Sequence, residues 1–407
     1  MTTNSITLAG ISGGGQYGLG ASSNTAVIGP KFLRTTDIVS GEIDWTRVPY
    51  CKADQKTIDK YRLSDGDIVI SRTGANAGLT AFVTSPPENS IFAGYLVRFK
   101  IDRDRAVPKF VSYILVSDTW KHYVATTRTG SAQPQFNAKI MGDFPMLLPS
   151  IQVQKASSEV LGALDEKIQI NKELSKTLED IAQTIFKSWF IDFDPVKAKM
   201  AGGKPVGMDD ATAALFPDSM EDSELGLIPR GWAVSTVGQF SPLVYGKALP
   251  AKDRNAGLIS VFGSNGIVGS HNSALLQAPT VVIGRKGTVG TVTLQLRPSW
   301  VIDTAFSCSP EMPENLYFAY LALSDLKLNE MNSDAAVPGL NRENVHRLEI
   351  LIATTELLRA FALMVAPLFE LSFQLREETG SLNLIRDSLL PRLISGELQI
   401  PEEMLVT

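Results

Sequence analysis

The chain has 407 residues, 44% of them hydrophobic and 20% charged, a composition that allows two or three folded domains and excludes a disordered chain. Its net charge of −5 argues against a uniformly basic nucleic-acid binder. Two cysteines, Cys51 and Cys308, and three scattered histidines exclude a disulfide framework and a cysteine-built zinc site, and predict a cytoplasmic protein. No apolar stretch is long enough to span a membrane, so we expect no membrane association.

The first half of the chain begins with a predicted lobe of short strands, residues 1–150. Runs rich in Val, Ile, Phe and Thr lie between glycine and asparagine turns at residues 67–70, 79–83 and 95–101. A helix is predicted at residues 109–122. A long helical pattern follows over residues 151–193 and predicts a spacer helix after the lobe.

The second half repeats this order after a segment rich in Pro, Gly, Ala and acidic residues. Residues 194–225 predict a linker with turns. A second lobe is expected over residues 226–352, and a second long helix with a C-terminal tail over residues 353–407. The predicted strands and helix of this lobe lie at residues 280–283, 291–294 and 316–326.

The two halves are copies of one unit. At an offset of 204 residues, Pro134 matches Pro338 and Asn137 matches Asn341, and the match continues into both long helices. At an offset of 213, residues 67–74 (DIVISRTG) match residues 280–287 (TVVIGRKG). A change of offset between matching blocks means that the intervening loops differ in length. The chain is therefore predicted to be lobe–helix–lobe–helix, with an α+β fold.

The charges follow the same division. Basic and acidic residues number 16 and 12 in residues 1–150, 8 and 14 in 151–225, 10 and 9 in 226–350, and 4 and 8 in 351–407. Two neutral-to-basic blocks, each followed by an acidic one, are compatible with DNA-facing lobes on acidic spacers, although many unrelated proteins share such a spread.

The long helices carry matching heptad patterns. The second helix repeats a leucine every seven residues, at Leu368, Leu375, Leu382 and Leu389. The counterparts in the first helix are Leu164, Asn171, Leu178 and Ile185. Companion apolar positions are Leu161, Ile168, Leu174 and Ile181 in the first helix, and Met364, Leu371 and Ile385 in the second.

Two matched seams in one chain favour pairing of the helices with each other over packing of each helix on its own lobe. Asn171 is then a buried polar residue that fixes the register. Antiparallel pairing would hold the lobes at opposite ends of the pair, whereas parallel pairing would bring them to the same end.

Three further segments resemble the specificity subunit of Type I restriction–modification systems. Residues 185–193 (IFKSWFIDF) resemble the family after its first helix, residues 223–232 (SELGLIPRGW) the start of its second lobe, and residues 388–398 (SLLPRLISGEL) its closing stretch. The repeated DIVISRTG and TVVIGRKG segments and the two proline loops also fit. The resemblance covers nearly the whole chain.

In that family, each lobe is a target recognition domain that reads half of a split double-stranded DNA site. The resemblance implies two such lobes separated by an antiparallel coiled coil, with an internal pseudo-twofold repeat. The coiled coil sets the gap between half-sites and binds two methyltransferase subunits, and restriction subunits join the full complex. S-adenosylmethionine, ATP and Mg belong to the partner subunits, so no cofactor and no catalytic activity are expected in this chain.

Features shared by both lobes cannot distinguish two different half-sites, so they are expected to be scaffold or phosphate contacts. Arg72 and Arg285 are shared, and each precedes a glycine loop that would let the backbone approach a polyanion. The competing interpretation is a surface arginine at a strand end, with glycines that close a turn. Tyr17 and Tyr245, each followed by glycine, are expected to pack either on the sugar–phosphate backbone or in the core.

Base contacts are expected from polar side chains in loops, because amides and guanidinium groups form paired hydrogen bonds with base edges. The candidates are Arg128, Gln133, Gln135 and Asn137 in the first lobe, and Asn265, Lys286, Asn341 and Arg342 in the second. An ordinary solvated side chain is the competing interpretation for each. The matching positions of Asn137 and Asn341 also favour a turn or backbone role.

Two other functions compete with DNA recognition. Ser85-Pro86-Pro87-Glu88 begins like the Asp/Asn/Ser-Pro-Pro-aromatic motif of DNA adenine methyltransferases, but Glu88 replaces the aromatic residue that would stack on a flipped base. No glycine fingerprint of a cofactor-binding βαβ unit accompanies it, so a proline loop is predicted at residues 85–90. A coiled-coil scaffold with two protein-binding lobes would keep the architecture, but its binding need not weaken steeply with salt as DNA binding does.

Overall fold

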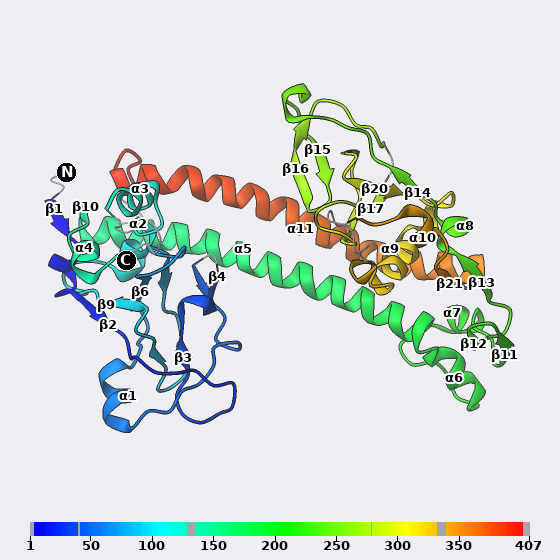
Figure 1. Ribbon diagram of the computed structural model, residues 1–407, viewed down its shortest axis with the longest axis horizontal. Helices are drawn as coiled ribbons and strands as arrows, with labels where there is room; N and C mark the ends of the chain where they lie inside the picture. The colour runs from blue at the N-terminus through cyan, green and yellow to red at the C-terminus, as the bar shows by residue number, and fades with distance from the viewer. Residues whose placement is uncertain (1–3, 40, 128–135, 278, 332–338, 402–407) are drawn as a thin grey trace. The chain divides into compact units, whose positions relative to one another are not determined.

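The computed structural model describes residues 4–39, 41–127, 136–277, 279–331 and 339–401 (Figure 1). The chain divides into two compact units, Met1–Gln169 with Gly380–Thr407, and Ile170–Thr379. Each unit holds one lobe and one stretch of each long helix, α5 (Ile151–Phe186) and α11 (Thr355–Ser395).

The first lobe is built on a four-stranded antiparallel sheet of order β2-β9-β6-β7. These strands are β2 (Gly15–Tyr17), β6 (Ile68–Ser71), β7 (Thr80–Phe82) and β9 (Leu96–Phe99). All of β6 is buried, which explains its continuous apolar run. The smaller pairs are β1 (Asn4–Thr7) with β10 (Pro145–Leu148), β3 (Phe32–Leu33) with β8 (Ile91–Phe92), and β4 (Ile38–Val39) with β5 (Glu42–Ile43).

The second lobe repeats this sheet in the order β14-β20-β17-β18. Its strands are β14 (Leu243–Tyr245), β17 (Thr280–Gly284), β18 (Val292–Gln295) and β20 (Ala305–Cys308). A three-stranded sheet joins β15 (Ile259–Gly263), β16 (Gly266–His271) and β19 (Ser299–Val301), and β13 (Ala233–Thr236) pairs with β21 (Glu349–Ile352). The same strand order in both four-stranded sheets confirms that the chain is a duplicated unit.

Short helices lie between the strands along the chain, as predicted, but one predicted helix is broken. They are α1 (Gln55–Tyr61), α2 (Pro108–Ile114), α3 (Asp118–Thr127), α4 (Ala138–Gly142), α8 (Val237–Phe240), α9 (Leu316–Asp325) and α10 (Arg342–His346). The prediction of one helix over 109–122 is wrong. The Ser117 hydroxyl accepts the Trp120 N–H at the start of α3, and the Trp120 indole donates to the Gly78 carbonyl at 3.0 Å, so a new helix begins there. None of the helices within the described ranges is both long and apolar enough to cross a membrane.

The proline loop at residues 85–90 is confirmed. It connects β7 to β8, and Ser85 and Asn89 both adopt left-handed backbone conformations, with φ of 42° and 62°. Such a path is a turn rather than a strand or helix.

Within each unit, α5 (green in Figure 1) and α11 (orange to red) run antiparallel. From one contact to the next, the residue number on α5 rises while that of its partner on α11 falls. The contacts that show this are Asn171–Glu378 and Ser175–Ser372, each at 2.8 Å, in the second unit, and Asp165–Arg386 at 3.3 Å in the first. The antiparallel alternative is therefore confirmed.

The heptad positions of the predicted seam are confirmed, whereas four of the seven companion positions are wrong. The eight heptad residues, Leu164 to Ile185 and Leu368 to Leu389, are all buried or half-buried. Among the companions, Leu161 and Ile168 are buried and Met364 is half-buried, but Leu174, Ile181, Leu371 and Ile385 are 42 to 48% exposed.

Beyond Ile168 on α5 and Met364 on α11, the second row of seam residues lies one residue further along each helix than predicted. Its members are Ser175 and Ala182 on α5, and Ser372 and Thr379 on α11. A coiled coil alternates steps of three and four residues along its seam. The step from Ile168 to Asn171 is three, so the next seam residue is Ser175, four residues on, and Leu174 lies outside the seam. The positions that do face the partner helix are small or polar, and a search for apolar residues misses them.

The segment predicted as a linker is folded. It contains α6 (Asp194–Met200), α7 (Asp210–Ala214) and β11 (Met220–Ser223), which forms a hairpin with β12 (Gly226–Pro229) just beyond the segment. Phe216 is buried and meets Trp189 edge-on at 5.0 Å, in a π-helical turn (Lys187–Ile191) that follows α5. The buried Phe216 side chain thus anchors the segment to the end of α5. The composition of the segment, rich in turn residues, did not indicate this packing.

Candidate nucleic-acid interface

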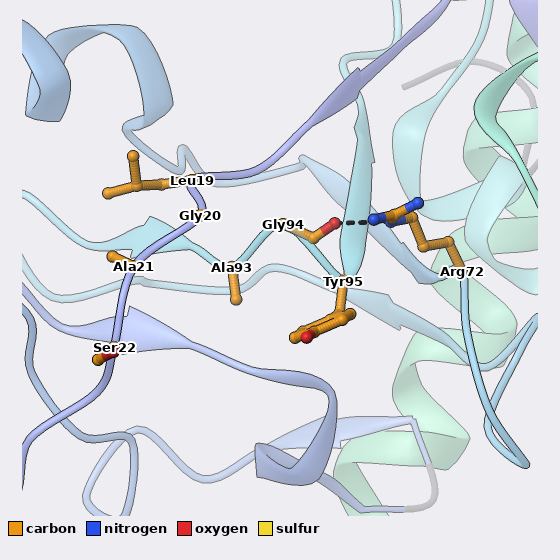
Figure 2. A pocket seen from close by; sticks show the side chains of 8 residues that line it. All are labelled: Leu19, Gly20, Ala21, Ser22, Arg72, Ala93, Gly94 and Tyr95. Carbon is orange, nitrogen blue, oxygen red and sulfur yellow. Dashed lines mark hydrogen bonds between the residues drawn. The ribbon is translucent and has the colours of Figure 1, made fainter.

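Tyr17 and Arg72 meet on the first lobe. Tyr17 ends β2, and Arg72 directly follows β6. The Arg72 guanidinium lies 5.3 Å from the centre of the Tyr17 ring, and its Nε donates to the Gly94 carbonyl at 2.7 Å (Figure 2). The ring and the carbonyl fix the cation in place while the Tyr17 ring stays 44% exposed.

The second lobe builds the same stack from Tyr245 and Arg285. The Arg285 guanidinium lies 4.7 Å from the Tyr245 ring centre, and its Nη1 donates to the Asp303 carbonyl at 3.1 Å. Arg342, in the first turn of α10, lies 5.0 Å from the same ring. It also donates two hydrogen bonds to Glu343 and thereby holds the pKa of that carboxyl below its usual value. Tyr245 is 46% exposed, so an aromatic surface with cations around it faces solvent.

The backbone around the two arginines is also repeated. The Arg72 carbonyl accepts the Phe136 N–H, and the Arg285 carbonyl accepts the Leu340 N–H, both at 2.9 Å. Each arginine loop therefore supports the segment that leads into α4 or α10. The contact of the arginine carbonyl with the residue two positions after the repeated proline is therefore the same in both lobes.

The glycines after the two tyrosines are required by close packing. A Cβ on Gly18 would lie 2.3 Å from the Ala93 carbonyl oxygen, and one on Gly246 would lie 2.1 Å from the Ile302 carbonyl oxygen. No other residue fits there, so the tyrosine strand can approach its neighbour only at glycine. The repeated Tyr-Gly pair is the sequence signal of this requirement, which the predicted roles of the tyrosines did not include.

The glycines that follow the two arginines close turns. Gly74 and Gly287 have φ of 73° and 80°, in the left-handed region that favours glycine. This geometry shows that the glycines close turns, a feature that both interpretations of the loops share. Phosphate contact by Arg72 and Arg285 stays a prediction.

Asn137 and Asn341 cap helices. The Asn137 Oδ1 accepts the Ile140 N–H at 2.9 Å at the start of α4, and the Asn341 Oδ1 accepts the Glu343 N–H at 2.9 Å at the start of α10. These bonds account for the backbone role that the repeat favoured. DNA contact by either residue stays a prediction.

The remaining candidates are partly described. Lys286 is exposed next to Arg285 and forms a backbone bridge with Gly339, and Asn265 is exposed at the turn between β15 and β16. Arg128, Gln133 and Gln135 lie outside the described residues. The structure thus brings Tyr245, Arg285, Lys286, Asn341 and Arg342 to one place on the second lobe, and Tyr17, Arg72 and Asn137 to the matching place on the first.

A pocket of about 450 Å³ lies beside Arg72 (Figure 2). It is lined by Leu19, Gly20, Ala21, Ser22, Arg72, Ala93, Gly94 and Tyr95. Tyr95 is 61% exposed, whereas the matching residue of the second lobe is Thr304. The first lobe therefore has a second exposed ring near its fixed cation, a surface for stacking and for an anion that Thr304 does not provide in the second lobe.

The family model described as Type I restriction modification DNA specificity domain matches residues 26–180 and 229–356. The chain belongs to this family. Each matched segment contains one of the two stacked arginines, so both specificity domains carry the same feature.

Similar proteins match most of the length of this specificity-domain chain. The specificity subunit of the HindI enzyme of Haemophilus influenzae is 24% identical over 90% of this chain and 94% of its own length. The MjaIX specificity subunit of Methanocaldococcus jannaschii is 24% identical over 74% of this chain and 72% of its own. The crystal structure of a Type I S subunit from M. genitalium superposes with a TM-score of 0.62 at 16% identity, over 98% of this chain and 97% of that one, and shows a shared fold.

Proposed function

We propose that this chain reads a split double-stranded DNA site and places the methyltransferase and restriction subunits of a Type I restriction–modification complex on it. The observation that carries the proposal is the duplicated Tyr–Arg stack, at the same place on two sheets of the same strand order. Membership of the specificity-domain family supports DNA as the ligand.

In this proposal, Arg72 and Arg285 each bind a phosphate on their half-site. A guanidinium whose Nε or Nη1 is already held by a carbonyl is oriented before DNA arrives, so less side-chain entropy is lost on binding. Because both lobes present the same group, these contacts set the position of the DNA backbone and do not select a sequence.

The chain itself is non-catalytic in this proposal. Cleavage and methylation belong to the partner subunits, together with S-adenosylmethionine, ATP and Mg, and the complex acts on DNA in the cytoplasm. The contribution of this chain is to bring two recognition lobes and the docking surfaces for those subunits into one molecule.

Exposed apolar residues on the long helices support the docking of partners. In the second unit, Ile170, Leu174 and Ile181 are 42 to 50% exposed along α5, and in the first unit Leu384 and Ile385 are 74% and 48% exposed on α11. Ile181 and Ile385 occupy the same repeat position, at an offset of 204. A repeated apolar position fits two copies of one partner, so we propose two methyltransferase subunits per chain.

The test is a DNA-binding titration of the chain with its methyltransferase subunit at two salt concentrations, with Arg72→Ala and Arg285→Ala. Each substitution should weaken binding to all sequences alike and lower the slope of log affinity against log salt by about 1, because one phosphate contact is lost. Lys155→Ala is the control, since it removes an exposed cation from α5 and leaves both stacks intact.

Thermal unfolding of each variant separates loss of contact from loss of fold. A changed sequence preference in Arg72→Ala or Arg285→Ala would show that these arginines read bases. Salt-independent binding by the unmodified chain would contradict DNA recognition and favour a protein-binding scaffold.

A further inference from the structure

The two lobes share the order of their four-stranded sheets, but one connection beside these sheets differs greatly in length. β3 pairs in parallel with β8 in the first lobe, and β15 pairs in parallel with β19 in the second. In both lobes another segment pairs antiparallel on the other side of β3 or β15. In the first lobe the bridge Lys31–Tyr50 makes this pairing beside β3, and in the second lobe β16 pairs with β15. Residues 34–48 join the two segments in the first lobe, whereas the two-residue turn Ser264–Asn265 joins them in the second.

We propose that the tip of the β15–β16 hairpin, residues 264–268, reads base edges in the half-site of the second lobe, with Asn265 as its hydrogen-bonding residue. The inference rests on the proposed DNA-reading function. Features common to both lobes cannot tell two half-sites apart, so the choice of bases depends on features that differ between the lobes. Among the connections between the described strands, this one differs most in length.

The turn lies against the loop of the stacked arginine. The Thr291 hydroxyl donates to the Ser264 carbonyl at 2.6 Å, and a Cβ on Gly287 would lie 3.8 Å from the Ser264 Oγ. A DNA backbone bound at Arg285 therefore passes beside the hairpin tip. Phosphate binding at Arg285 would thus present nearby bases to Asn265.

The exposed side chains of the tip have the chemistry of base edges. Asn265 is exposed, and an amide matches the paired donor and acceptor that adenine shows in the major groove. Ile267 and Val268 follow it on β16 and are 65% and 43% exposed, which suits contact with a thymine methyl group. Two antiparallel strands are narrow enough to enter the major groove.

The hairpin is held firmly at its base and along its edge. His271, at the end of β16, is buried, accepts the Asn255 N–H at 3.0 Å and meets Trp300 edge-on at 5.4 Å. Arg254 donates to the Val268 carbonyl at 2.6 Å, so this part of the strand edge is already bonded within the lobe. Recognition then falls to the side chains of the tip.

The experiment is methylation-site sequencing with the full chain in complex with its methyltransferase subunit. Asn265→Ala should lower discrimination at one position of one half-site by about 5- to 150-fold, the range expected for one paired amide–base contact. The other half-site and the gap should not change. Asn265→Asp should shift the preference at that position towards cytosine, whose amino group donates to a carboxylate.

Asn272→Ala is the matched control, because Asn272 is an exposed asparagine at the opposite end of the same hairpin. An unchanged motif in both Asn265 variants, an equal loss at all sequences, or the same change in Asn272→Ala would overturn the inference. If the unmodified chain yields no split motif, the proposed function fails instead. A split motif that both Asn265 variants leave intact refutes the hairpin assignment alone.

Discussion

At the scale of residues, the repeat keeps positions and changes chemistry. Tyr113 and Tyr317 are 204 residues apart, and so are their helix partners Asp165 and Phe369. The Tyr113 hydroxyl donates to Asp165 at 2.6 Å, whereas Tyr317 stacks on Phe369 with ring centres 5.4 Å apart. Burial and the Asp165 carboxylate raise the pKa of Tyr113 well above its usual range, so its hydroxyl remains a donor. The same lobe-to-helix contact is thus polar in one unit and aromatic in the other.

The two cysteines provide a residue-scale prediction. Burial raises the pKa of the Cys308 thiol to about 11 and raises that of the Cys51 thiol above its usual value. The thiolate is the reactive form, so at pH 8 Cys308 stays almost entirely in its unreactive protonated form, and its position in β20 shields it. We expect negligible alkylation of the native protein at pH 8 and two labels per chain in urea, measured by mass spectrometry.

A Cys51→Ala variant assigns any native labelling to Cys308. Rapid labelling of Cys308 in that variant at pH 8 would contradict the buried position of β20. Labelling that begins only with unfolding would agree with it.

At the scale of elements, the helix pair depends on a seam that mixes apolar and polar layers. Leu178 and Leu375 are each 8% exposed in the second unit, while Asn171 and Ser175 occupy neighbouring seam positions and form hydrogen bonds to α11. Polar layers of this kind stabilise less than leucine would, but they specify which residues face each other. The apolar residues outside the seam are left for other contacts.

Two leucines on one helix test this arrangement. Leu178→Ala should lower the free energy of unfolding by about 2–5 kcal/mol, because it leaves a cavity in the seam. Leu174→Ala, four residues away and 42% exposed, should change it by less than about 1 kcal/mol. Chemical denaturation followed by circular dichroism measures both. Equal losses in the two variants would mean that Leu174 lies in the seam, as the heptad pattern first predicted.

At the scale of the whole molecule, duplication gives one chain two versions of each surface. Both lobes carry a Tyr–Arg stack, and both units expose an isoleucine at the same repeat position of a long helix. A single chain that carries two equivalent surfaces can bind two copies of one partner without itself forming a dimer.

Partner stoichiometry tests this proposal. Ile181→Glu and Ile385→Glu should each reduce the number of methyltransferase subunits bound per chain from two to one, because a buried unpaired carboxylate opposes docking. Native mass spectrometry of the complex counts them. Val206→Glu, at a 97% exposed apolar residue outside the long helices, is the control and should leave two bound. Two subunits bound to both isoleucine variants would place the docking surface elsewhere.

The sequence alone indicated the duplication, five of the eight strands in the two four-stranded sheets, both long helices and the pair of shared arginines. Each of these is a local pattern, such as the buried runs Ile68–Ser71 and Thr280–Gly284 or the leucine every seven residues of α11. Only the tertiary structure decided the break before α3, the second row of seam residues and the folded segment around Phe216, because buried residues from distant elements fix them. The tertiary structure also brought Tyr17 to Arg72 and Tyr245 to Arg285. The two tyrosines are 228 residues apart and the two arginines 213, so the repeat alone does not pair them. Strands far apart in the chain place these residues side by side, and sequence spacing carries no record of such pairing.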